Sequence, residues 1–159
     1  MMSLYQMLCF VMPFLYSCQQ ITDGKQIKMY KNCGPDSIKY ISMDPCEIEP
    51  CVFTKGENVS VTIDFTTNST VTDVQAKVYG EVAGVFVPFA LPNPDGCQGC
   101  DLTCPLGAGE QSYTNTFPVL AIYPEIKVVV KWELLDQDSN TLVCFEFPMQ
   151  ITESAGNIY

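Results

Sequence analysis

The sequence predicts an all-β domain in which half-buried antiparallel strands pack as two sheets. Three observations lead to this fold class. Apolar and polar residues alternate with a period of two in several short segments, turn-forming residues separate those segments, and no segment has convincing helical periodicity. Short strands with turns between them favour a β-sandwich, although the pattern alone is also compatible with a closed barrel.

The expected strands follow one another along the chain. Alternation occurs at 59–65, 74–78, 126–134 and 143–151. A short apolar run from Val85 to Phe89 ends in the Pro-rich turn 91–96, and the polar turn 136–140 joins the last two strands. On those last two strands, the apolar side chains share one face: Ile126, Val128, Val130, Trp132 and Leu134 on the first, and Val143, Phe145, Phe147, Met149 and Ile151 on the second.

The N-terminal segment resembles a secretory signal peptide. Leu4 to Tyr16 is mostly apolar but too short to span a bilayer, and the small residues Ser17 and Cys18 follow it. We expect a signal peptide over 1–18, cleaved between 17 and 20, and a single domain over 19–159 that is secreted or lies in the lysosomal lumen. A buried N-terminal strand or helix is the alternative interpretation.

The composition excludes several classes of function. The formal net charge of −10 disfavours nucleic acid as a partner, because an acidic surface repels the phosphate backbone. The chain has no histidine, and its eight basic residues are all lysines, so histidine-based catalysis and zinc ligation are absent. No pair of carboxylates is placed across a substrate by the sequence. We therefore expect no enzyme activity and no cofactor.

The cysteines indicate a disulfide framework in an exported chain. Of the nine, Cys9 would leave with the signal peptide, and Cys18 lies at its end. Cys46 and Cys51 bracket one small loop, three cysteines (Cys97, Cys100 and Cys104) crowd a second loop, and Cys33 and Cys144 lie near the two ends of the mature chain. The spacing of Cys97 and Cys100 also fits a metal or redox motif, but no second pair or histidine completes such a site.

Two tripeptides follow the rule for N-linked glycosylation. One begins at Asn58 and the other at Asn68. Asn68 lies in a polar, turn-like stretch and is the better acceptor.

The chain resembles the ML lipid-recognition family over roughly 32–152. The motifs that carry the resemblance are Val-Pro-Phe at 87–89, Pro-Asp-Gly-Cys at 94–97, Phe-Pro-Val at 117–119, Tyr-Pro at 123–124, and the stretches 126–134 and 144–151. The family implies an immunoglobulin-like sandwich whose two sheets splay around an apolar ligand. It also implies the disulfides Cys33–Cys144, Cys46–Cys51 and Cys97–Cys104. Cys100 is extra and is expected either to pair with Cys18 or to remain an odd thiol.

The resemblance also implies which residues contact the ligand. The matching positions are Phe89, Tyr113, Phe117, Pro118, Val119, Tyr123, Val130, Trp132 and Phe145. Phe145 stands where the family's sterol carriers have tryptophan, and Phe117 stands where they have leucine, which changes the expected pocket shape. Without the resemblance, these residues would be interpreted as ordinary sandwich core.

The expected function is therefore lipid carriage. We expect a monomer that holds a sterol or a fatty acid between its sheets and delivers it to a membrane or to a lipid-receiving membrane protein. The alternative within the family is an immune co-receptor that recognises glycolipid. The acidic balance argues against it, because lipid phosphates need basic residues at the rim.

Overall fold

The computed structural model describes residues 24–154, and this part of the chain forms β-strands without a helix. The strands are β1 (Lys25–Gln26), β2 (Lys31–Asn32), β3 (Ile38–Asp44), β4 (Cys51–Thr54), β5 (Asn58–Thr67), β6 (Gln75–Val82), β7 (Val85–Phe89), β8 (Gly109–Pro118), β9 (Ile126–Leu135) and β10 (Thr141–Thr152). Among these residues there is no helical stretch of the length and apolarity that a bilayer crossing requires. The expected signal peptide lies outside the described residues.

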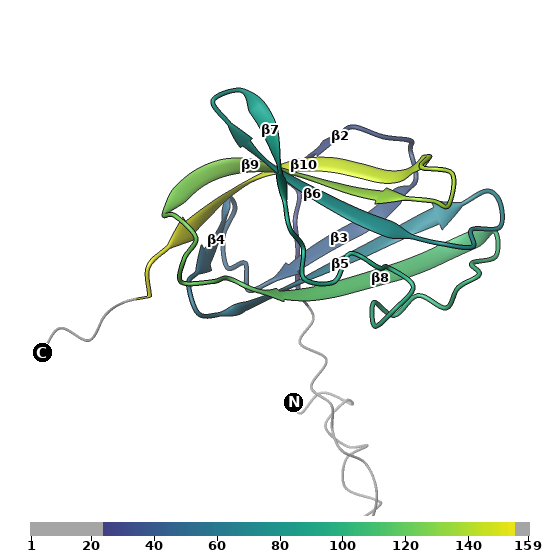
Figure 1. Ribbon diagram of the computed structural model, residues 1–159, viewed down its shortest axis with the longest axis horizontal. Helices are drawn as coiled ribbons and strands as arrows, with labels where there is room; N and C mark the ends of the chain where they lie inside the picture. The colour runs from purple at the N-terminus through teal and green to yellow at the C-terminus, as the bar shows by residue number, and fades with distance from the viewer. Residues whose placement is uncertain (1–23, 155–159) are drawn as a thin grey trace, which may run out of the picture.

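The strands form two sheets that face each other as the layers of a sandwich (Figure 1). The four-stranded sheet has the order β1-β3-β5-β8, and the six-stranded sheet has the order β2-β10-β9-β6-β7, with β4 also paired to β10. Neighbouring strands are antiparallel except β4 and β10, which are parallel. The hairpin of β6 and β7 projects at the top of the view.

The core lies between the two sheets, where the inward-facing residues of each strand meet. In β5, residues at every second position from Val59 to Thr67 are buried, while those between them are partly exposed. In β9, Trp132 and Leu134 are 1% and 0% exposed. The alternation predicted for 59–65 and 126–134 is therefore confirmed, because one face of each strand packs on the opposite sheet.

Three disulfides join the cysteines that the family resemblance pairs. They are Cys33–Cys144, Cys46–Cys51 and Cys97–Cys104. The first closes a loop with a sequence separation of 111 and ties β10 to the turn after β2. The eighth cysteine, Cys100, is buried and has no disulfide partner among residues 24–154. Cys18 lies outside that range.

A candidate apolar ligand site between the sheets

The six-stranded sheet supplies one wall of a cavity. The register pairs Val130 with Phe147, Val128 with Met149, and Ile126 with Ile151, and all six side chains line the cavity. These residues occupy every second position, so strand periodicity alone places them on one face. The lysines between them, Lys127 and Lys131, lie on the opposite face.

The hairpin of β6 and β7 extends this wall. Val78 of β6 pairs with Trp132 on one side and with Phe89 on the other, and Gly80 pairs with Val130 and Val87. All five of these residues line the cavity. A Cβ on Gly80 would lie 3.5 Å from a methyl carbon of Val128, an ordinary van der Waals distance. The absence of a side chain at Gly80 therefore leaves cavity volume open.

The opposite wall comes from the end of β8 and the loop that follows it. Phe117, Val119 and Tyr123 line this side. The backbone of Val119 is fixed by two hydrogen bonds, since its N–H donates to the carbonyl of Glu57 at 2.8 Å and its carbonyl accepts from Gly56 at 2.7 Å. The ring of Tyr123 packs edge-on against Phe89, with 5.4 Å between centroids. This contact joins the two walls.

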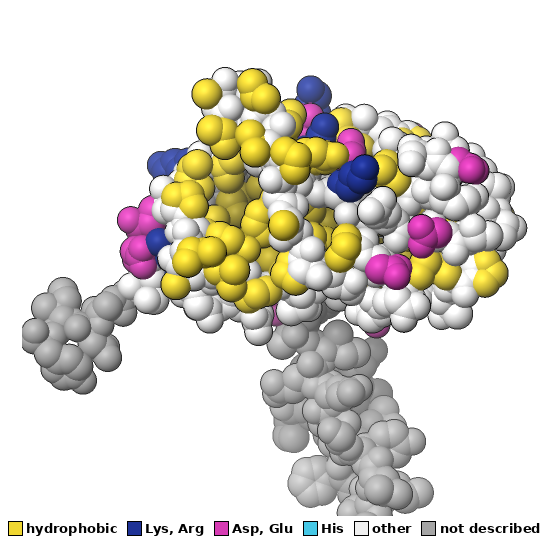
Figure 2. Space-filling view, in the orientation of Figure 1, with side chains coloured by type: hydrophobic (Ala, Val, Ile, Leu, Met, Phe, Trp, Pro, Cys, Tyr) yellow, Lys and Arg dark blue, Asp and Glu magenta, His cyan; other side chains and the backbone are white. Residues whose placement is uncertain are grey.

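The cavity has a volume of about 250 Å³ and opens to solvent at one end. Figure 2 shows the opening as a hollow lined by hydrophobic side chains, with the charged side chains lying outside it. Partial exposure of Ile126, Val128 and Val130, against 1% exposure of Trp132, places the open end near Ile126 and the closed end at Trp132.

The walls are almost entirely hydrocarbon. Of the nineteen lining residues, only Tyr79, Tyr123 and Trp132 carry a side-chain nitrogen or oxygen. Burial raises the pKa of Tyr123, so its hydroxyl stays protonated and neutral. No lysine or carboxylate contributes to the lining. Such a surface favours an apolar ligand that gains by leaving water, and it provides no catalytic group.

Six of the nine ligand-contacting residues expected from sequence lie on the cavity wall: Phe89, Phe117, Val119, Tyr123, Val130 and Trp132. Three are placed elsewhere. Tyr113 and Phe145 are 0% exposed and belong to the core beyond the closed end, and Pro118 points away because it alternates with Phe117 and Val119. Tyr113 touches the site only through its ring, 6.3 Å from that of Trp132.

Several wall residues were not predicted as ligand contacts. They include Phe53 of β4, Val78 and Gly80 of β6, and Phe147, Met149 and Ile151 of β10. The sequence places Phe147 and Met149 on an inward face, but a period of two cannot tell a cavity wall from a filled core. The contribution of Phe53 depends on the parallel pairing of β4 with β10, for which the sequence carries no signal.

A buried polar cluster lies beside the site, under the loop that carries Cys97 and Cys104. The amide of Asn115 donates to the Tyr113 hydroxyl at 2.8 Å and to the carbonyl of Asn93 at 2.9 Å. The Cys100 thiol accepts from the Asn93 amide at 3.4 Å, and burial raises its pKa. A protonated thiol is a poor nucleophile and a poor metal ligand, so this cluster serves to hold the loop.

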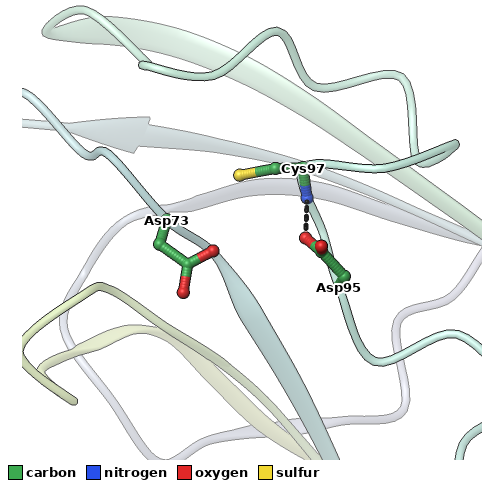
Figure 3. Close-up of side chains that lie close together, drawn as sticks. All are labelled: Asp73, Asp95 and Cys97. Carbon is green, nitrogen blue, oxygen red and sulfur yellow. Dashed lines mark hydrogen bonds between the residues drawn. The ribbon is translucent and has the colours of Figure 1, made fainter.

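Asp73, Asp95 and Cys97 lie close together on the surface (Figure 3). The Cys97 sulfur is already bonded to Cys104, so it cannot act as a thiolate ligand. One carboxylate oxygen of Asp95 accepts a hydrogen bond from the Cys97 backbone at 2.9 Å and thus orders the turn. The metal interpretation of the Cys97–Cys100 spacing therefore lacks the thiolates that it requires.

The fold and the cavity define a disulfide-linked β-sandwich suited to holding an apolar ligand between its sheets. A family model described as an ML domain matches residues 28–151, and the chain belongs to this family.

Two relatives and one solved structure extend this comparison. The NPC intracellular cholesterol transporter 2 of Mus musculus is 41% identical over 126 residues, which is 77% of this chain and 84% of the relative. The homolog a of Drosophila melanogaster is 39% identical over 127 residues, covering 77% and 86%. The crystal structure of a Niemann-Pick type C2 protein from Japanese carpenter ant superimposes with a TM-score of 0.74 at 27% identity, over 79% of this chain and 100% of that chain.

Proposed function

We propose that this protein carries an apolar lipid, a sterol or a fatty acid, in the cavity between its sheets and hands it to an acceptor. The observation that carries the proposal is the apolar cavity itself, which opens to solvent and has no charged side chain in its lining. The 41% identity to a protein named as a cholesterol transporter supports a sterol as one ligand.

The energetics of such a site need little polar chemistry. Each heavy atom of a drug-sized ligand contributes about 0.3 kcal/mol, so a ligand of sterol size would bind with a Kd on the order of a micromolar. The cavity of about 250 Å³ is slightly below the usual range of ligand pockets, roughly 300–1,000 Å³. A sterol therefore separates the walls further or extends through the open end.

Within this proposal, the six wall residues expected from sequence contact the ligand, and the Tyr123 hydroxyl orients it near the mouth. Phe89 and Tyr123 touch across the cavity, so a bound lipid displaces this contact. We assign Tyr113, Pro118 and Phe145 no direct contact, because none of them lines the cavity.

We further propose that the chain acts as a monomer outside the cytosol, with no covalent chemistry. The apolar segment at 4–16 and the disulfides support export. Asn58 and Asn68 are both exposed, as glycosylation requires. The acceptor is a membrane or a lipid-receiving membrane protein, approached with the open end of the cavity.

The test is a binding titration of residues 19–159 with a fluorescent sterol and a fluorescent fatty acid. We expect saturable binding with a Kd on the order of a micromolar or tighter. Phe89→Ala removes wall contacts and Val119→Phe fills the space with a ring, so both should weaken binding. Vesicle-to-vesicle transfer of the preferred probe then tests handover.

Absence of binding by well-folded protein would overturn the carrier proposal. A requirement for lipid phosphate in that protein would favour glycolipid recognition instead. Turnover of lipid esters would contradict the assignment of a purely non-covalent function.

A further inference from the structure

One buried polar group in the cavity has no partner. Trp132 is 1% exposed and lines the cavity, and its indole N–H finds no hydrogen-bond acceptor among the described residues. Buried donors in proteins are almost always paired, because an unpaired donor has lost its bonds to water and gained nothing. A conserved architecture does not require this donor, so its position calls for an acceptor from elsewhere.

The neighbours of the indole ring offer none. The rings of Tyr113 and Phe117 pack against it at centroid distances of 6.3 Å and 5.9 Å. The Tyr113 hydroxyl already accepts a hydrogen bond from Asn115. On the same sheet, Trp132 is flanked by Val78 and Phe145, which carry only hydrocarbon side chains. The cavity is the remaining side from which an acceptor can reach the nitrogen.

The donor lies at the closed end of the cavity. Exposure along β9 falls from the partly exposed Ile126, Val128 and Val130 to the buried Trp132, and Leu134 beyond it is 0% exposed. A lipid that enters from the open end therefore brings its leading end to the indole N–H.

We propose that the Trp132 indole N–H donates a hydrogen bond to an uncharged oxygen on the leading end of the lipid. This inference rests on the proposed function and names the ligand class more closely, as an apolar lipid oxygenated at the end that enters first. A sterol hydroxylated at the tip of its side chain fits, with its ring hydroxyl near the mouth and Tyr123.

The oxygen must be uncharged. No lysine lines the cavity, so a carboxylate carried to the closed end would be buried without a counter-charge, which is strongly unfavourable. A fatty acid accordingly enters with its hydrocarbon tail first and leaves the indole N–H unpaired.

The first experiment compares two sterols that differ in one atom. Competition against a fluorescent sterol measures the affinity of residues 19–159 for cholesterol and for cholesterol hydroxylated at the branched end of its side chain. We expect the hydroxylated sterol to bind about fivefold tighter, since a neutral hydrogen bond is worth about 1 kcal/mol net. In Trp132→Phe, the ratio should fall to about one, because phenylalanine has no donor. In the control Phe117→Leu, which alters a ring contact of Trp132 but no donor, the ratio should persist.

The second experiment does not depend on any variant. Trp132 is the only tryptophan in the sequence, so the nitrogen-15 spectrum of the chain contains one indole N–H signal. Its proton resonance should move downfield on saturation with the side-chain-hydroxylated sterol and not with cholesterol.

The outcomes separate the two proposals. Equal affinities for the two sterols, with the same indole resonance in both complexes, would overturn the hydrogen bond and leave the carrier function standing. Failure of the folded protein to bind either sterol or a fatty acid would overturn the carrier function, and this inference with it.

Discussion

Filling the cavity from Gly80 should abolish much of the binding without unfolding the protein. Gly80 lies on β6, lines the cavity and faces Val128, so the substitution Gly80→Phe directs a ring into the ligand space. Its backbone is not in the left-handed region, and a Cβ there meets nothing closer than 3.5 Å. The variant should therefore fold with unchanged or higher thermal stability, because the ring buries apolar surface.

The size of the effect follows from the cavity volume. A cavity of about 150 Å³ accommodates a benzene ring, so the phenylalanine ring takes more than half of the 250 Å³ available here. The side chain adds seven carbon atoms. If it displaces as many ligand atoms at about 0.3 kcal/mol each, the loss is about 2 kcal/mol, or roughly 30-fold in Kd.

The assay is the fluorescent-lipid titration, combined with thermal unfolding of each variant. Gly107→Phe provides the matched control, because Gly107 is exposed, lies outside the cavity and has open space around its Cβ position. Gly107→Phe should bind as the wild type does. Wild-type affinity in a folded Gly80→Phe variant would show that the lipid does not occupy this cavity.

Three further predictions concern stability and pH. Replacing both Cys33 and Cys144 by alanine should lower the free energy of unfolding by about 4.8 kcal/mol in the chain-entropy model, measured by denaturant titration; a loss below about 2 kcal/mol would contradict it. Ligand affinity should change less than about twofold from pH 5 to 8, because the chain has no histidine and burial raises the pKa of Tyr123; a titration step near pH 6.5 would refute this. Asp136 has a pKa lowered from its ordinary 3.8, because burial, which raises it, is outweighed by hydrogen bonds from Asn140 and Asp138. Its contribution to stability is therefore present above pH 3.8 and disappears as the pH falls through the lower folded-state pKa. Asp136→Asn keeps an acceptor but cannot titrate, so its unfolding profile should lose that acid-dependent component, and a profile parallel to the wild type would show that Asp136 does not cause it.

The strands that the sequence predicts are those whose alternation is unbroken. β5, β9 and β10 show it along most of their length. β3 does not, because a register shift between Ile38 and Tyr40 interrupts the pattern. β8 does not, because its inward face includes the buried amide of Asn115, whose partners come from Asn93 and Tyr113. A buried polar residue satisfied from distant loops cannot be told from an exposed one in the sequence.

The candidate site was predicted in direction but not in depth. Val130, Trp132 and Phe145 all face inward, as their spacing requires. Phe145 nevertheless lies in the filled core, stacked on Phe147 at 5.6 Å, while Phe147 lines the cavity. The place where the two sheets begin to separate depends on their relative position in three dimensions, and a period of two contains no information about it.

The pairing of β9 with β10 also sets a length scale for the cargo. Six residues separate Trp132 at the closed end from Ile126 at the open end, which corresponds to about 20 Å along the strand. The strand thus acts as a ruler, and each further pair of residues would lengthen it by about 7 Å. A lipid longer than this measure leaves its surplus beyond Ile126 and Ile151. The length of β9 therefore decides which part of the cargo an acceptor meets first.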